Sequence, residues 1–77
     1  MNQSIKERVI KILKNFSKKE DVAFDDGTEL KDLGLDSLDT VEMVMEVESE
    51  FSIQISDDAA AEFKTIGEIV NFITNAK

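Results

Sequence analysis

The stretch DLGLDSLDTVEMVMEVESEF, residues 32–51, decides the fold of this 77-residue chain. From Ser37 onward, its apolar residues recur at the three- and four-residue spacing that is typical of an α-helix. Asp36 precedes this run, where its carboxylate can accept a hydrogen bond from an N–H group of the first turn and cap the helix. The pattern predicts a helix from about Ser37 to Phe51.

The predicted helix carries different side chains on its different faces, when successive residues are placed about 100° apart. The core-facing stripe contains Met43, Val44, Val47 and Phe51. An acidic stripe contains Asp39, Glu42, Glu46 and Glu50. Next to the acids lie three apolar residues outside the core stripe, Leu38, Val41 and Met45, of which we expect Leu38 and Met45 to be largely exposed. An apolar anchor with a charged rim is a small docking surface, although a small bundle could also wrap a wide apolar face around its own core.

Three further helices are predicted by period and caps. The first runs from about Ile5 to Phe16, and Ser4 with Glu7 has the form of a capping box in front of it. A single turn over 57–62 follows Ser56, and a last helix begins near Ile66. The chain is therefore expected to be a single all-α domain over 1–77, a four-helix bundle with three longer helices and a short third one.

The connection between the first two helices, 17–36, is unusually long for so small a domain and is predicted to be a loop. Asp25-Asp26-Gly27 indicates a turn, and Gly34 indicates a tight turn into the second helix. The expected anchors of this loop in the core are Val22, Phe24, Leu30 and Leu33.

Composition limits the chemistry that the chain can perform. It contains neither cysteine nor histidine, which removes the usual zinc sites and the Cys–His and Ser–His nucleophile pairs. A core of this size also leaves little room for a buried cleft. We therefore do not expect an enzyme.

The net charge is −8, and its distribution is uneven. No Lys or Arg occurs in 32–63, where ten acidic residues gather: Asp32, Asp36, Asp39, Glu42, Glu46, Glu48, Glu50, Asp57, Asp58 and Glu62. Such a surface repels nucleic acid and anionic lipids, so neither is expected as a partner, whereas basic patches on other proteins are. With no signal-peptide pattern and no apolar stretch of about 20 residues, we expect a cytoplasmic or organelle-interior location, with the cytoplasm as the first expectation. Nothing in the sequence demands dimerisation, so we expect a monomer.

The string from Asp32 to Met45, DLGLDSLDTVEMVM, resembles the attachment motif of acyl carrier proteins. The resemblance continues through Ile55 to the Thr65-Ile66-Gly67 segment and covers essentially the whole chain. It implies that Ser37 receives 4′-phosphopantetheine from coenzyme A through a phosphopantetheinyl transferase, with Asp36 beside the attachment point. The arm would then carry an acyl chain as a thioester between enzymes of fatty acid biosynthesis that have basic docking patches.

The resemblance also implies which residues the partner enzymes contact. The positions that match the recognition helix are Leu38, Asp39, Val41, Glu42, Met45 and Glu48, and Glu46 joins them through the acidic stripe. Phe63 departs from the family pattern, which has an aliphatic residue at this position, and so leaves the preferred chain length open.

Other interpretations remain open at this stage. A carrier for polyketide, peptide or D-alanine transfer, or an unmodified acidic interaction domain, would share the same surface. A calcium-binding loop around Gly27 has apolar residues, among them Val22 and Phe24, at its ligand positions and is rejected. The clustered carboxylates of Asp36, Asp39 and Glu42 predict at most a weak divalent cation site, and divalent cations should raise the melting temperature.

Overall fold

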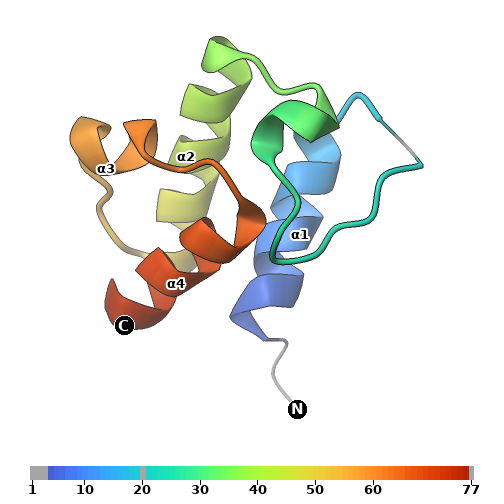
Figure 1. Ribbon diagram of the computed structural model, residues 1–77. Coiled ribbons are helices and arrows are strands. Elements are labelled where there is room, and N and C mark those ends of the chain that lie inside the picture. The colour runs from blue at the N-terminus through green and yellow to red at the C-terminus, as the bar shows by residue number, and fades with distance from the viewer. Residues whose placement is uncertain (1–3, 20, 77) are drawn as a thin grey trace.

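The computed structural model describes residues 4–19 and 21–76, and its fold is the expected helical bundle (Figure 1). The four α-helices are α1 Ile5–Phe16, α2 Ser37–Phe51, α3 Asp57–Ala61 and α4 Ile66–Ala76. A 3₁₀ helix, η1 Leu30–Leu33, lies within the long connection between α1 and α2. The described residues contain no strand, and none of their helices combines the length and apolar content needed to cross a bilayer.

The predicted boundaries of the helices are confirmed with one small difference at the end of the third. They were predictable because local capping residues fix where a helix begins. The Ser4 hydroxyl accepts from the Glu7 N–H at 3.1 Å, and the Glu7 carboxylate accepts from the Ser4 N–H at 3.4 Å. Ser56 caps α3 through its hydroxyl alone, which accepts from the Ala59 N–H at 3.1 Å. The third helix ends one residue earlier than predicted, because Glu62 forms its C-cap.

The sequence did not predict η1, which replaces part of the expected irregular loop. Its first and last residues, Leu30 and Leu33, are buried, whereas the two residues between them are exposed. With three residues per turn, a 3₁₀ helix places positions i and i+3 on the same side, so both leucines reach the core. Gly34 ends the turn with a φ of 81°, the left-handed conformation that glycine adopts without strain.

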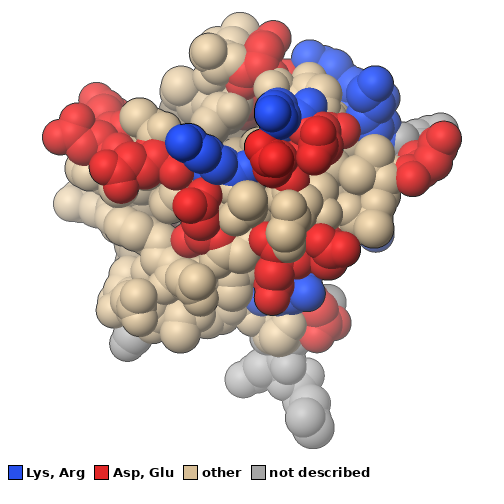
Figure 2. All heavy atoms as spheres, viewed as in Figure 1, with Lys and Arg blue, Asp and Glu red and all other residues tan. Residues whose placement is uncertain are grey.

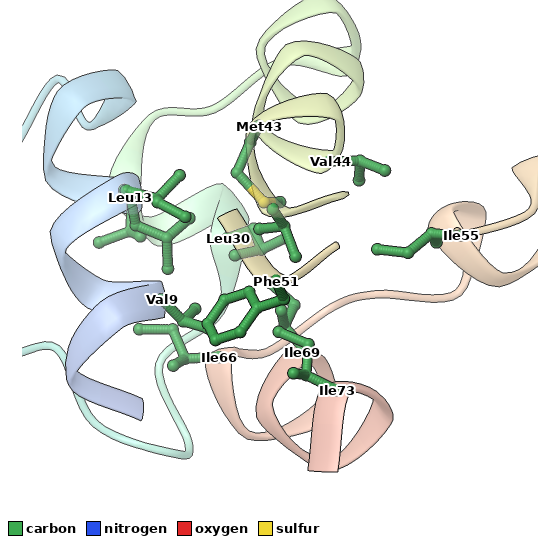
Figure 3. Packing of buried hydrophobic residues seen from close by; sticks show 13 residues of the cluster. Val9, Leu13, Leu30, Met43, Val44, Phe51, Ile55, Ile66, Ile69 and Ile73 are labelled. Atoms are coloured by element: carbon green, nitrogen blue, oxygen red, sulfur yellow. The ribbon is translucent and has the colours of Figure 1, made fainter. Parts of the chain in front are cut away.

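One hydrophobic core holds the helices together (Figure 3). α1 packs against both α2 and α4, and the core-facing stripe predicted for α2 is fully buried. The core contains Val9, Ile12, Leu13, Leu30, Leu33, Met43, Val44, Val47, Phe51, Ile55, Ile66, Ile69 and Ile73. Burying each side chain of this size stabilises the fold by about 1.5–3 kcal/mol before entropy is counted.

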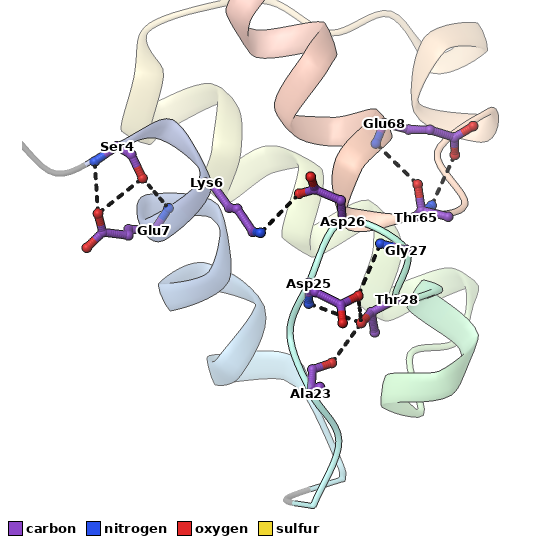
Figure 4. A network of polar contacts seen from close by, with 10 residues as sticks. All are labelled: Ser4, Lys6, Glu7, Ala23, Asp25, Asp26, Gly27, Thr28, Thr65 and Glu68. Carbon is purple, nitrogen blue, oxygen red and sulfur yellow. Dashed lines mark hydrogen bonds and ion pairs between the residues drawn. The ribbon is translucent and has the colours of Figure 1, made fainter.

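The loop before η1 is hydrogen bonded to the start of α4, and Figure 4 shows the two segments side by side. The carbonyl of Thr28 accepts from the Ile66 N–H, and the carbonyl of Asp26 accepts from the Gly67 N–H, both at 3.0 Å. The buried Thr28 hydroxyl donates to the Ala23 carbonyl at 2.7 Å. These bonds fix the expected turn at residues 25–27, and Thr28 after it, against α4.

A second set of contacts joins α1 to the end of α2. Arg8 lies over the Phe51 ring, with its guanidinium carbon 4.3 Å from the ring centroid. The same guanidinium donates to the Glu50 carboxylate at 2.9 Å and to the Glu50 carbonyl at 3.0 Å. Arg8 therefore satisfies a free carbonyl at the C-terminus of α2, where a cation is also favoured by the helix dipole.

Candidate functional site

The start of α2 is built by two nearby acids that cap each other. The Asp36 carboxylate accepts from the Asp39 N–H at 2.8 Å, and the Asp39 carboxylate accepts from the Asp36 N–H at 3.4 Å. This capping box fixes the backbone on both sides of Ser37. The predicted capping role of Asp36 is confirmed, and Asp39 joins it as a reciprocal partner.

Ser37 is the first residue of α2, and its side chain is exposed. Within the described part of the chain, its hydroxyl makes no hydrogen bond, and the N–H groups of Ser37 and Leu38 have no acceptor. Free N–H groups at a helix N-terminus are favourable donors to a phosphate group. The Ser37 oxygen is thus open to modification at a point where a phosphodiester would be stabilised.

A lysine from the loop after α1 lies against the two capping acids. Lys18 Nζ is 2.8 Å from Asp39 Oδ2 and 3.9 Å from Asp36 Oδ2. The hydrogen bond from Lys18 holds the pKa of the Asp39 carboxyl below its ordinary value, and the same bond raises the pKa of Lys18. Lys18 therefore neutralises part of the negative charge that Asp36 and Asp39 place beside Ser37.

Two shallow grooves open at Ser37, and the side chains of Thr40 and Phe63 line both. One, of about 600 Å³, runs between α2 and α3 and is lined by Ser37, Thr40, Val41, Asp57, Ala60, Ala61 and Phe63. The other, of about 630 Å³, is lined by Glu29, Leu30, Lys31, Leu35, Asp36, Ser37, Thr40, Phe63 and Lys64. Phe63 packs edge-on against Phe72, with ring centroids 5.5 Å apart, so it is fixed between the grooves. A flexible arm attached at Ser37 would have a surface channel on either side, so the residues present fit such a group.

The exposure predicted for Leu38 and Met45 is confirmed, and Val41 between them is exposed as well. Leu38, Val41 and Met45 are 66%, 56% and 60% exposed, and they are the large hydrophobic side chains of the described residues that lie open to solvent. They begin one residue after Ser37 and lie on the side of α2 that faces away from the core. An exposed apolar group of this kind is characteristic of a contact surface for another protein.

The carboxylates predicted to surround this patch fall into different environments. Glu42 and Glu46 are exposed and make no ion pair with any described residue. Glu48 is half-buried, and its carboxylate accepts from the Ile55 N–H at 2.8 Å, so it holds the link between α2 and α3. Figure 2 shows acidic atoms clustered at the α3 edge and spread across the visible face, with the largest group of basic atoms at the upper right, near the loop after α1.

The carboxylates of Asp36, Asp39 and Glu42, where a weak cation site was expected, do not form a ready-made ligand cluster among the described residues. Among residues 4–19 and 21–76, no group of three or more carboxylates is arranged to hold a metal ion. The physical reason is that Asp36 and Asp39 each already accept hydrogen bonds at the helix start and share the Lys18 ammonium.

Two residues that border the candidate site were missed by sequence reasoning. Lys18 carries no local signal beyond its place in a basic segment, since its pairing with Asp39 spans 21 residues. Thr40 looked like an ordinary helical position, yet it lines both grooves. The glycine at position 34 was the available hint for Lys18, because a glycine can mark a place where another segment packs closely.

The chain is similar to known protein sequences over almost its whole length. The family model described as the phosphopantetheine attachment site matches residues 5–73. The acyl carrier protein of Buchnera aphidicola subsp. Acyrthosiphon pisum (strain 5A) is 42% identical over 74 residues, which cover 95% of this chain and 92% of that protein. Its counterpart from strain Tuc7 is 42% identical over 72 residues, covering 92% and 90% of the two chains.

Solved structures agree with the sequence relatives. A structure from Mycobacterium tuberculosis described as an acyl carrier protein has a TM-score of 0.84 at 27% identity and covers 94% of this chain and 97% of its own. A solution structure from Anaplasma phagocytophilum, described in the same way, has a TM-score of 0.82 at 33% identity and covers 95% and 88%. Match length, identity and fold together place this chain in the acyl carrier protein family, whose members carry acyl groups on covalently attached 4′-phosphopantetheine.

Proposed function

We propose that Ser37 is the residue of this chain to which 4′-phosphopantetheine is attached. The observation that supports it most is the exposed Ser37 hydroxyl, which has no partner among the described residues and stands between two grooves at the start of α2. When bound, the arm supplies the terminal thiol that a thioester requires and that this chain, without cysteine, does not contain.

The residues around Ser37 have distinct tasks in this proposal. The N–H groups of Ser37 and Leu38 would donate to the phosphate oxygens, since neither has an acceptor within the described residues. Asp36 and Asp39 hold the first turn of α2 in place, and Lys18 is paired with the Asp39 carboxylate beside the attachment point. None of these side chains is required to break or form a bond in the cargo, so we propose a carrier without catalytic activity of its own.

Partner enzymes would dock on the exposed side of α2. Leu38, Val41 and Met45 provide the apolar contact, and Glu42 and Glu46 provide unpaired negative charge at its rim. Such charge speeds the encounter with basic surfaces, while a small apolar patch allows rapid release. Glu48 acts at this surface indirectly, through the α2–α3 link that it holds.

The partners that this arrangement suits are a phosphopantetheinyl transferase and the enzymes of fatty acid synthesis, in a cytoplasmic setting. The Buchnera relatives are acyl carrier proteins, which supports the fatty-acid branch. A specialised pathway would use the same arm and surface. Incubation of the loaded chain with malonyl, amino-acid and D-alanine transfer enzymes separates malonyl-based carriers from peptide and D-alanine carriers by the group each enzyme adds.

The attachment site is tested by intact-protein mass after incubation with coenzyme A and a broad-specificity phosphopantetheinyl transferase. The unmodified chain and a Ser49→Ala control, which removes a serine from the same helix, should each gain one phosphopantetheine. Ser37→Ala should gain none. Full loading of Ser37→Ala would place the attachment elsewhere, and no loading of any variant would favour the unmodified interaction domain.

A further inference from the structure

Lys18 is held against the start of α2 by its backbone as well as by its charge. Its N–H donates to the Leu33 carbonyl at 2.9 Å, which ties the loop after α1 to the end of η1. Its aliphatic stem lies over Gly34, where a Cβ atom would come within 3.1 Å of the Lys18 Cβ. Glycine at position 34 therefore provides the space through which the lysine reaches the acids of α2.

The ammonium of Lys18 covers the carboxylate of Asp39, close to Ser37. The Asp39 side chain is only 20% exposed, whereas that of Lys18 is 58% exposed and can move into solvent. Glu42 and Glu46, farther along the same helix, have no such cation among the described residues. The carboxylates of Glu42 and Glu46 on the docking surface are thus unpaired among the described residues, whereas the Asp39 carboxylate near the attachment point is paired with Lys18.

We propose that Lys18 competes with the cationic side chains of docking enzymes for Asp39, and that productive docking at Ser37 requires Lys18 to leave this carboxylate. The proposal rests on the proposed attachment of the arm to Ser37. An exposed ion pair is weak enough to open on each encounter. An enzyme that places Arg or Lys beside Ser37 displaces Lys18, whereas a basic surface that reaches only Glu42 and Glu46 does not.

The alternatives for Lys18 make different predictions. A lysine that only stabilised the loop would affect unfolding and leave docking rates unchanged. A lysine that contacted the incoming phosphate or the enzyme would speed loading, and its removal would slow the reaction. A competitor opposes docking, so its removal should speed the reaction, and this gain should disappear as salt screens the charges.

The test compares Lys18→Met with Lys19→Met. The substitution Lys18→Met keeps an unbranched stem over Gly34 and loses the ammonium. The control removes a neighbouring exposed lysine that makes no ion pair with a described residue, so both variants have the same net charge. Lys18→Arg keeps the cation. Urea unfolding first establishes that each variant is folded at the assay temperature.

The kcat/KM for loading Ser37 with the transferase is measured at low salt and at about 1 M salt. We expect Lys18→Met to load roughly threefold faster than Lys19→Met at low salt, and the two to converge at high salt, where the Debye length is about 3 Å. Lys18→Arg should stay near the unmodified chain. Carboxyl NMR should show a higher pKa of Asp39 in Lys18→Met than in the unmodified chain, because the bond that lowers it is lost.

The outcomes separate the two proposals. The proposed competition is overturned if Lys18→Met loads no faster than Lys19→Met at low salt. It is also overturned if the pKa of Asp39 is the same in Lys18→Met as in the unmodified chain. A chain that is not loaded in any form overturns the attachment at Ser37, and the competition with it.

Discussion

Replacing Arg8 by Met should destabilise the bundle more than any other substitution of a single surface cation. The guanidinium makes three contacts at one place: the Glu50 carboxylate, the Glu50 carbonyl and the Phe51 ring. Methionine has a similar helix propensity and an unbranched stem that replaces the aliphatic part of arginine, so the substitution removes these contacts while it retains the packing of the stem. The contacts join α1 to the end of α2, where the helix has no basic residue of its own in the last turn.

The size of the effect follows from the geometry. An exposed ion pair contributes about 0.2–1 kcal/mol, and a cation over an aromatic ring contributes about 0.5–1 kcal/mol at an exposed site. A cation at a helix C-terminus adds about 0.3–1 kcal/mol. The Arg8 side chain is 32% exposed and Phe51 is buried, so we take the energy of each contact from the middle of its range. We expect a loss of about 2 kcal/mol in the free energy of unfolding, a large share of the roughly 3–5 kcal/mol that a core of this size supplies.

Thermal and urea unfolding followed by circular dichroism measure this loss. The melting temperature should fall by roughly 8–16 °C, since each kcal/mol shifts a domain of this size by about 4–8 °C. Lys11→Met is the matched control, because it removes an exposed cation of α1 that makes no ion pair among the described residues. High salt should remove only the ion-pair part of the stability difference between Arg8→Met and the unmodified chain. A loss below about 0.5 kcal/mol, or one equal to that of Lys11→Met, would refute the reasoning.

Two further predictions concern the start of α4. Gly67→Ala should destabilise the fold although alanine is the better helix former, because the new Cβ would lie 2.9 Å from the Asp26 carbonyl oxygen; a higher urea midpoint than that of the unmodified chain would contradict the clash. Hydrogen bonds from the N–H groups of Lys64 and Thr65 hold the pKa of Glu68 below its ordinary value of 4.5. A folded-state pKa that is depressed gives stability that is present above the unfolded pKa and is lost as pH falls through the lowered value. Urea unfolding from about pH 6 to about pH 2 should therefore show a shallower acid loss for Glu68→Gln, and parallel curves for the two chains would count against it.

Helix positions and faces were predictable because they depend on residues close together in sequence. The cap of α2 needs Asp36 and the first turn alone, and the buried stripe from Met43 to Phe51 needs only the helical period. The exposure of Leu38 and Met45 follows from the same period, once the core stripe faces inward. Local chemistry thus accounted for the scaffold around Ser37.

The contacts that brace this scaffold were not predictable for the opposite reason. Lys18 meets Asp39 across 21 residues, and Arg8 meets Glu50 across 42. Each depends on how the long connection and α1 settle against α2, which no periodicity in the sequence describes. The 3₁₀ turn of η1 was missed for the same reason, because it forms when its two leucines enter a core that the helices have built.

The strength of these distant contacts differs in a way that fits the proposed role of the site. At the far end of α2, Arg8 combines charge, a backbone hydrogen bond and a ring contact, so that end is held firmly. At the Ser37 end, the Lys18 ammonium makes only ion pairs with exposed or half-buried acids, and water can replace each of them. A carrier needs both properties, because the helix must keep its position while partner enzymes exchange at its first turn. If the Lys18 contact were as strong as that of Arg8, docking at Ser37 would have to break a structural clamp on every cycle.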